Sequence, residues 1–308
     1  MYHIIINPAS RSGKGRLIWK EQIEPALQRD SVPFQAYFSE KAGDVIKLAK
    51  NITEQAEESM LSLIILGGDG TLNEAIQGIR DFSKVTLGYI PTGSSNDLAR
   101  DLGISFVPTV ALDCILHTGC PHSLDIGTVT YENGSSRRFV VSCGIGYDAA
   151  ICEEALHSRL KNTLNRFGLG KLTYVGIALK QLITTKKVSA KLYLDNRAPI
   201  SLENMLFTAC MLHRYEGGGF MFCPDANPAD GIINLCAVGD ISKALVVMAL
   251  PSAMKGKHYR FQGITPHQAE KIVIEASTPL WIHTDGEVTR KSKKITVSCN
   301  QQCLNMIY

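Results

Sequence analysis

Short runs of apolar residues alternate with longer amphipathic stretches through the first third of the chain. The runs are rich in isoleucine, leucine and valine, which are typical of buried strands, and the stretches repeat their apolar positions at helical spacing. They predict strands at residues 2–7, 34–39, 61–66 and 85–90, and helices at residues 15–29, 43–58 and 72–80. This alternation predicts an α/β domain with a parallel, Rossmann-like sheet covered by helices.

After about residue 125 the apolar positions recur at every second residue. We predict short strands at residues 138–142, 188–195, 205–212, 232–238, 271–275, 281–283 and 295–298. This pattern is typical of an all-β sandwich or an open barrel, and we predict the sandwich. The predicted domains are residues 1–125 and 126–290, with residues 291–308 as a C-terminal segment able to return to the first domain. No flexible linker separates them, so we expect the domains to pack across a cleft, where ligands usually bind.

Composition narrows the class of protein. The 32 basic residues nearly balance the 29 acidic ones, which argues against a nucleic-acid-binding protein. Residues 1–7 lack the basic leader of a signal peptide, and the longest apolar run, residues 244–254, is shorter than the roughly 20 residues that span a bilayer. The nine cysteines contain no CxxC pair, so we expect reduced thiols. These features predict a cytoplasmic protein without a transmembrane helix.

The most informative motif is LIILGGDGTLNE at residues 63–74, where a predicted strand enters a glycine-rich turn and then a helix. Gly67, Gly68 and Gly70 would let the backbone approach a ligand, and the start of the helix would offer its N–H groups to phosphate. The alternative is a strand-to-helix turn in which the glycines and Asp69 serve backbone geometry only.

Asp69 stands out in this turn because a carboxylate would repel phosphate. It would be useful if it holds a divalent cation, orders a water or accepts a proton from an attacking hydroxyl. Thr71 and Glu74 have the spacing of a capping box, which predicts where the helix begins.

Two further strand-to-helix loops have a similar composition. One is PTGSSND at residues 91–97, and the other is NPASRSGKG at residues 7–15, which lacks the spacing of a P-loop. Ser95, Asn96 and Asp97 could also be ordinary N-cap residues. Because loops at the carboxyl ends of parallel strands face one crevice, the three together predict a phosphate site.

The combination of NPASRSGKG, GGDGTLNE and PTGSSNDLAR resembles the diacylglycerol kinase catalytic family, in particular the soluble bacterial enzymes and their lipid-kinase relatives, including sphingosine kinases. The resemblance continues through GGG at residues 217–219, PDA at 224–226, DG at 230–231 and DGE at 285–287. It therefore covers nearly the whole chain. In that family the GGDGT fold is shared with NAD kinases and phosphofructokinases, so this motif alone leaves the substrate open.

The resemblance implies ATP and Mg²⁺ as cofactors and a set of nucleotide-binding positions. These are Asn7, Pro8, Ser10, Ser12, Gly13, Lys14, Ser39, Gly67, Gly68, Gly70, Thr71, Asn73, Glu74, Thr92, Gly93, Ser94 and Asn96. Ser94 stands where the family more commonly has threonine, which keeps the hydroxyl.

The resemblance also implies catalytic and metal positions. Glu287 matches the residue proposed as the catalytic base in bacterial kinases, and Asp69 would act with magnesium and water, although in some relatives the equivalent Asp is the base. Asp125 would extend this network, or it is a buried turn carboxylate. A structural magnesium ion would be held by Asn227, Asp230 and the carbonyl of Ile232, in a loop that the residues alone describe equally as a β-turn.

Two basic segments suggest how the acceptor is reached. Residues 157–171 contain four basic and no acidic residues interleaved with apolar ones, and residues 255–260 form a second basic cluster. Such segments can rest on an anionic membrane, or they are solvated helix faces. We therefore expect transient peripheral membrane association.

These observations predict an ATP-dependent lipid kinase that phosphorylates diacylglycerol or a related lipid, giving phosphatidic acid or its analogue. One alternative is an NAD kinase-like enzyme with a soluble substrate, and another is a non-catalytic regulator that binds ATP or lipid. The expected partner is a lipid substrate at a membrane surface rather than a nucleic acid. An edge strand of the second domain would also allow a homodimer.

Overall fold

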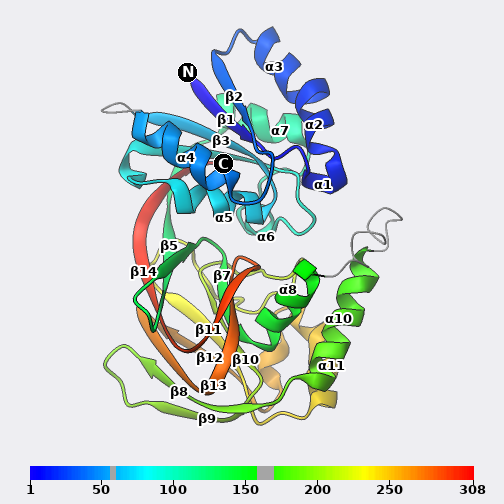
Figure 1. Cartoon of the computed structure of the whole chain (residues 1–308), viewed down its shortest axis with the longest axis vertical. Helices are drawn as coiled ribbons and strands as arrows, with labels where there is room; N and C mark the ends of the chain where they lie inside the picture. Colours follow the sequence, from blue (N-terminus) through cyan, green and yellow to red (C-terminus); the bar gives the residue numbers. More distant parts are fainter. Residues whose placement is uncertain (56–59, 158–169) are drawn as a thin grey trace. The chain divides into compact units, whose positions relative to one another are not determined.

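A computed structural model describes residues 1–55, 60–157 and 170–308 of the chain. The chain forms two compact units (Figure 1). Unit 1 contains Met1–Ile126 and Gln301–Tyr308, and unit 2 contains Gly127–Asn300. The chain leaves unit 1 along strand β5 (Pro121–Tyr131) and returns along strand β14 (Glu287–Ile307).

Unit 1 is built on a parallel sheet with the strand order β2–β1–β3–β4–β14. The first four are β1 (Tyr2–Ile6), β2 (Phe34–Phe38), β3 (Leu61–Gly67) and β4 (Val85–Pro91). The isoleucines and leucines of β1 and β3 are fully buried on both faces of the sheet, as in sheets that helices cover. The predicted α/β domain with a parallel sheet is confirmed.

The helical segments of unit 1 differ in detail from the prediction. They are α1 (Ser10–Gly13), α2 (Gly15–Ile18), the π-turn η1 (Trp19–Ile23), α3 (Glu24–Arg29), α4 (Asp44–Gln55), α5 (Asp69–Gly78), η2 (Phe82–Lys84), α6 (Asp97–Leu102), α7 (Pro108–Asp113) and η3 (Cys114–Thr118). The helix predicted for residues 15–29 is present with these bounds as a continuous helical segment. Its prediction as a regular α-helix is wrong at residues 19–23, where a π-turn ends two residues before Pro25, which has no N–H for the helical hydrogen bond.

The predicted capping box is also wrong. Helix α5 begins at Asp69, and its N-cap is Gly68 in extended backbone with no side-chain cap. The Thr71 hydroxyl instead accepts a hydrogen bond from Asn7, and the Glu74 carboxylate accepts one from the backbone of Gly43. Both side chains therefore connect α5 to neighbouring loops rather than cap it.

Unit 2 is rich in strands, and its main sheet has the order β12–β11–β10–β7–β13–β14. The strands of unit 2 whose bounds have not yet been given are β6 (Ser136–Phe139), β7 (Ser142–Gly146), β8 (Val188–Leu194), β9 (Ile200–Met205), β10 (Phe207–Met211), β11 (Ile233–Val238), β12 (Ile264–Ala269) and β13 (Lys271–Thr284). The segments predicted at residues 271–275 and 281–283 belong to one strand, with a register shift between Glu275 and Leu280. The strand predicted at residues 138–142 contains the break between β6 and β7.

Both faces of β10 are buried, for two different reasons. Cys210 and its neighbours on one face pack in a core made by the other strands, including β13 and β14. Phe207 and Ala209 on the opposite face pack in a second core with helices α10 (Gly170–Thr184) and α11 (Lys243–Ala253). These helices and α8 (Tyr147–His157) were not predicted from the sequence.

Candidate functional site

Side-chain hydrogen bonds join the three predicted loops of unit 1. The Asn7 amide donates to the Thr71 hydroxyl over 2.9 Å, which connects the loop after β1 to helix α5. The Ser10 and Thr92 hydroxyls form a buried hydrogen bond of 2.8 Å, and the Thr92 N–H donates to the carbonyl of Gly67 over 2.7 Å. The loops that follow β1, β3 and β4 therefore form one site at the carboxyl ends of these strands.

Two glycines of this site are required by close approach of the backbone. A Cβ atom on Gly93 would lie 2.6 Å from the Cα atom of Gly68, and a Cβ atom on Gly68 would lie 2.9 Å from the Cα atom of Gly93. Neither backbone can yield to a methyl group without moving its loop. The glycine pair therefore keeps two strand-to-helix turns in direct contact.

Unusual backbone conformations occur in the loops after β1 and β4. Arg11, Ser12 and Gly13 follow one another with positive φ angles of 52°, 58° and 89°. Asn96 also has a positive φ, of 49°, and its side chain accepts from the N–H of Gly93 and donates to the carbonyl of Gly93. Asn96 is thus the N-cap residue of α6 by position, but its side chain closes the loop instead of capping the helix.

A hydrogen bond joins Asp69 to the backbone at the start of α6. Asp69 accepts a hydrogen bond from the backbone N–H of Asp97 over 3.1 Å. Burial raises the pKa of Tyr89 well above its ordinary value, and the negative charges of Asp69 and Asp97 raise it further. The Tyr89 hydroxyl therefore stays neutral. Carboxylate oxygens are ligands that magnesium prefers, and the role of Asp69 toward Mg²⁺ stays a prediction.

The other nucleotide-binding positions predicted in unit 1 divide into exposed and buried ones. Ser12, Gly13, Lys14 and Ser94 are exposed at the loop surfaces. Ser39, at the end of β2, is buried, and its hydroxyl donates to the carbonyl of Ile6 over 3.5 Å. The exposed group is available to a ligand, whereas Ser39 contributes to packing beside Asn7.

Asp125 is fully buried in unit 1 and connects two strands. Its carboxylate accepts from the backbone N–H of Gln302 over 2.7 Å. Gln302 has a positive φ of 48°, so this hydrogen bond stabilises an unusual backbone conformation in β14. The role of Asp125 in a magnesium and water network stays a prediction.

In unit 2, Glu287 begins β14 directly after a turn that Asp285 fixes in place. The two carboxylate oxygens of Asp285 accept from the backbone N–H groups of Val140, Val141 and Ser142 over 2.8 to 2.9 Å. Asp285 also has a positive φ of 49°. The turn that carries Glu287 is therefore attached to the segment between β6 and β7, which explains the break between those strands.

We expect Asp285→Asn to destabilise the protein by roughly 2–4 kcal/mol, since an amide nitrogen would face backbone donors that a carboxylate now accepts. Asparagine tolerates a positive φ, so the change tests the hydrogen bonds and not the backbone conformation. Denaturant unfolding of both proteins measures the difference. An unchanged free energy of unfolding would show that these hydrogen bonds contribute nothing.

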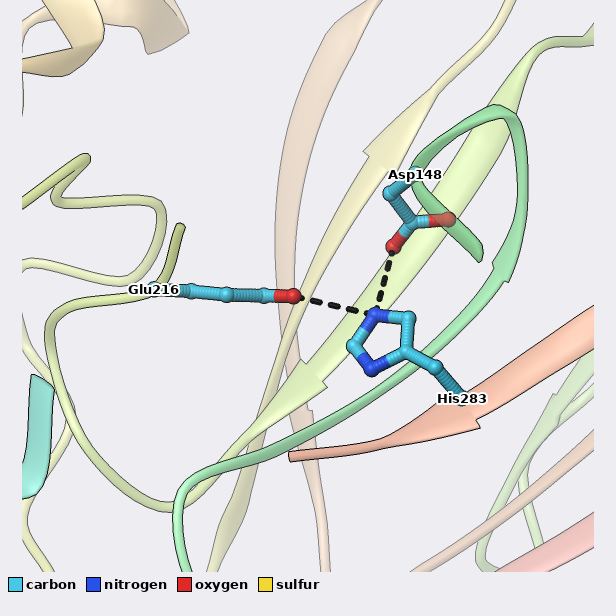
Figure 2. A group of neighbouring side chains, drawn as sticks. All are labelled: Asp148, Glu216 and His283. Atoms are coloured by element: carbon cyan, nitrogen blue, oxygen red, sulfur yellow. Dashed lines mark hydrogen bonds and ion pairs between the residues drawn. The ribbon is translucent and has the colours of Figure 1, made fainter. Parts of the chain in front are cut away.

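Next to this turn lies a cluster of the half-buried Asp148 and Glu216 with the buried His283 (Figure 2). The His283 Nε2 atom lies 3.3 Å from Asp148 Oδ2 and 3.0 Å from Glu216 Oε1. The three residues come from the start of α8, the loop before the triple glycine and the end of β13. Gly144 makes room for them, because a Cβ atom there would clash with both Asp148 and His283.

The hydrogen bonds of His283 favour a proton over a metal ion in this cluster. Its Nδ1 atom accepts from the N–H of Gly286 over 3.2 Å, so the neutral ring carries its proton on Nε2, toward the two carboxylates. Burial lowers the pKa of His283, but the surrounding groups, including Glu216 and Asp148, outweigh it and raise the pKa. Protonation of Nδ1 would break the hydrogen bond from Gly286, so that bond favours the neutral ring. Either protonation state leaves a proton on Nε2, where a metal would need a lone pair. The cluster instead positions Gly286, the neighbour of Glu287.

Cys152 lies within the same group of charges. Burial raises the pKa of its thiol to about 11; His283 lowers it, while Glu216, Asp148 and Glu287 add to the increase. The thiol is therefore protonated at neutral pH and is a poor nucleophile. The negative charge of Glu287 therefore acts on the Cys152 thiol together with the charges of Asp148 and Glu216.

The predicted structural magnesium loop is a pair of turns. The Asn227 side chain accepts from the N–H of Ala229 over 3.2 Å, and the Asp230 carboxylate accepts from the N–H of Ile232 over 2.9 Å. Such bonds to a backbone two residues ahead are typical of Asx turns. The assignment of Asn227, Asp230 and Ile232 to magnesium stays a prediction.

If this loop holds magnesium, Asp230→Ala should lower the melting temperature by several degrees, and excess EDTA should lower that of the wild type but not of the variant. A structural ion stabilises only the folded form, so both treatments remove the same contribution. Thermal unfolding with magnesium and with EDTA measures it. Equal responses of the two proteins to EDTA would contradict the assignment.

The two basic segments have different outcomes. Residues 158–169, which contain Arg159, Lys161 and Arg166, lie outside the described residues. In the second cluster Lys255, Lys257 and Arg260 are exposed, but His258 is buried and its ring bonds to the carbonyl of Phe222. Within the part of the chain that the structure describes, no helix combines the length and the apolar character needed to cross a membrane.

Family comparison assigns both units. Residues 1–129 match the diacylglycerol kinase catalytic domain, and residues 141–308 match the YegS C-terminal NAD kinase beta sandwich-like domain. The first match contains the three joined loops, and the second contains the turn with Glu287 and the cluster around His283.

Individual relatives agree over most of the chain. A diacylglycerol kinase of Bacillus subtilis strain 168 is 29% identical over 290 residues, covering 92% of this chain and 88% of that protein. A diacylglycerol kinase of Staphylococcus aureus strain JH9 is 28% identical over 292 residues, covering 92% and 85%. The crystal structure of a diacylglycerol kinase from Bacillus anthracis strain Sterne has the same fold, with a TM-score of 0.72 at 20% identity over 100% of this chain and 96% of that one.

Proposed function

The chain belongs to the family that joins a diacylglycerol kinase catalytic domain to a YegS C-terminal domain, and from this premise we propose that it transfers a phosphoryl group from ATP to a lipid hydroxyl. The observation that carries the proposal is the joined set of glycine-rich loops in unit 1. Phosphoryl transfer needs mainly positioning and charge stabilisation, which such loops supply.

The loops of unit 1 would bind the phosphates of ATP. Exposed groups at Ser12, Gly13, Lys14 and Ser94 supply a cation, hydroxyls and backbone N–H groups toward phosphate. Asp69 and Asp97 would hold Mg²⁺, which offsets the negative charge of the phosphates when it binds with ATP.

In unit 2, Glu287 would accept the proton of the acceptor hydroxyl. The hydroxyl oxygen forms a bond to the γ-phosphorus, the bond from that phosphorus to the β–γ bridging oxygen breaks, and ADP leaves. Asp285 and His283 hold the turn on both sides of Gly286, so the Glu287 backbone is fixed before substrate binds. Diacylglycerol is the acceptor that the names of the relatives suggest.

A transfer assay tests this proposal. The protein is incubated with γ-labelled ATP, magnesium and diacylglycerol or sphingosine in detergent micelles, with NAD in a parallel tube because the second domain is described as NAD kinase-like. The proposal predicts label in phosphatidic acid. Label in NADP, or ATP bound without transfer to any acceptor, would contradict it.

We expect Gly93→Ala to raise the KM for ATP roughly 10- to 100-fold, equivalent to the loss of one or two charge-assisted hydrogen bonds. The added methyl group would push the loop away from Gly68, where backbone atoms already touch. Steady-state kinetics at varied ATP measures the change. Gly176→Ala is the matched control, because a Cβ atom there meets nothing within 4 Å. An unchanged KM for ATP in the Gly93→Ala variant would show that these loops do not bind the nucleotide.

A further inference from the structure

Helix α10 exposes apolar side chains where a surface helix normally exposes polar ones. Its exposed positions in the second half include Leu179, Lys180 and Ile183, which follow helical spacing and so share one face. Ile183 is 75% exposed, the largest value among the exposed large hydrophobic residues of the described chain. Among the described residues of unit 2, none covers Ile183.

Helix α11 continues this feature. Between residues 244 and 251 every exposed residue is apolar, while Val246 and Ala249 face the core. The exposed residues are Ala244, Leu245, Val247, Met248 and Pro251. The helix is therefore apolar on its solvent side as well as on its buried side.

The end of α10 and the start of α11 lie together. The Lys243 ammonium group donates to the carbonyl of Ile183 over 2.7 Å and to that of Thr185 over 3.0 Å. Figure 1 also shows the two helices side by side on unit 2. We call the exposed apolar residues within residues 176–183 and 244–251 the apolar helical face.

The surroundings of this face are basic. No Asp or Glu occurs in residues 170–191 or 241–260, although the chain has 29 acidic residues. These stretches contain Lys171, Lys180, Lys186, Lys187, Lys191, Lys243, Lys255, Lys257 and Arg260. One of the lysines, Lys180, is paired with Glu154 of α8. Lys255 and Lys257 are exposed directly after α11.

We propose that the apolar helical face docks on an anionic lipid bilayer. Apolar side chains flanked by lysines are the pattern of interfacial membrane helices, in which the apolar groups enter the acyl boundary and the cations meet lipid phosphates. Pairing of the face with a second copy would bring two cationic surfaces together, so charge favours lipid over self-association. The proposal rests on the proposed function for its purpose, which is to bring the kinase to a lipid acceptor.

Flotation with lipid vesicles tests this surface without ATP. We expect the protein to float with phosphatidylcholine–phosphatidylglycerol vesicles at low salt and not with pure phosphatidylcholine vesicles. The double variant Ile183→Asp/Met248→Asp should bind at least tenfold more weakly, because both side chains leave the apolar boundary and add negative charge. Val110→Asp is the matched control, since Val110 is 53% exposed on α7 of unit 1.

Three results would contradict the proposed docking surface. They are wild-type protein that ignores anionic vesicles, a double variant that binds like the wild type, and a wild-type dimer that the double variant converts to monomer. If the double variant melts at a lower temperature, Lys255→Gln/Lys257→Gln replaces it and should weaken the salt-dependent part of binding. Wild-type binding by this second variant would also contradict the proposal.

Activity separates this proposal from the proposed function. A protein that floats with anionic vesicles but phosphorylates no lipid keeps the docking surface and contradicts the kinase proposal. A protein that phosphorylates diacylglycerol in micelles but does not float contradicts the docking surface alone. The double variant should keep wild-type turnover on micellar diacylglycerol and lose turnover on vesicles.

Discussion

Glu287→Gln should lower kcat roughly 10²- to 10⁴-fold, the usual range for the loss of a general base. Glutamine has nearly the same size but cannot accept the proton of the acceptor hydroxyl. The turn should stay in place, because Asp285 and His283 hold it through bonds that do not involve the Glu287 side chain. Steady-state turnover on micellar diacylglycerol measures the effect.

Glu275→Gln is the control for this substitution. It makes the same chemical change on β13, where the carboxylate is half-buried, paired with Lys294 and bonded to the Tyr193 hydroxyl. We expect the control to keep wild-type turnover and both variants to keep the wild-type melting temperature. Turnover of Glu287→Gln within threefold of the wild type would remove this residue from the reaction.

Asp69→Asn should lower kcat roughly 10²- to 10³-fold, comparable with the loss of one group that stabilises transition-state charge. The variant removes the negative charge of the carboxylate that accepts from the backbone of Asp97, and so weakens the oxygen ligands that the site would offer to magnesium. Turnover is measured across a range of magnesium concentrations. We expect the variant to need more magnesium than the wild type to reach its reduced maximum.

Asp113→Asn provides the matched change at an exposed position on α7 of unit 1. It should leave both the maximal turnover and the magnesium dependence unchanged. A variant at Asp69 that recovers full turnover in excess magnesium would assign this residue to ion affinity alone. Wild-type behaviour at every magnesium concentration would contradict its place in the site.

The parallel sheet of unit 1 could be predicted because its strands are buried on both faces and therefore continuously apolar. Ile4, Ile5 and Ile6 show this burial directly. The helices of unit 2 could not be predicted in the same way. Residues 244–251 of α11 are apolar toward solvent as well as toward the core, so they lack the amphipathic period that identifies a surface helix. The apolar solvent side of α11, which prevented its prediction from the sequence, is also the surface that we assign to membrane docking.

The loops of the candidate site could be predicted because their glycines and hydroxyl residues follow predicted strands directly. The detailed contacts could not. Thr71 and Glu74 have capping spacing, but tertiary partners take up both side chains. The cluster around His283 is also absent from any local pattern, since His283 and Asp148 are separated by 135 positions. Two sequence signals could have indicated members of this cluster. His283 lies next to the DGE motif, and Glu216 lies next to the triple glycine.

The central claim is that this chain phosphorylates a lipid with ATP, and mass spectrometry of a total lipid extract tests it most directly. The extract is incubated with the protein, magnesium and ATP carrying ¹⁸O in the γ-phosphoryl group, and a parallel sample contains Glu287→Gln. The account predicts heavy phosphatidic acid at the expense of diacylglycerol in the first sample and a large reduction in the second. Consumption of ATP with no ¹⁸O-labelled lipid, or label found in a water-soluble acceptor, would contradict it.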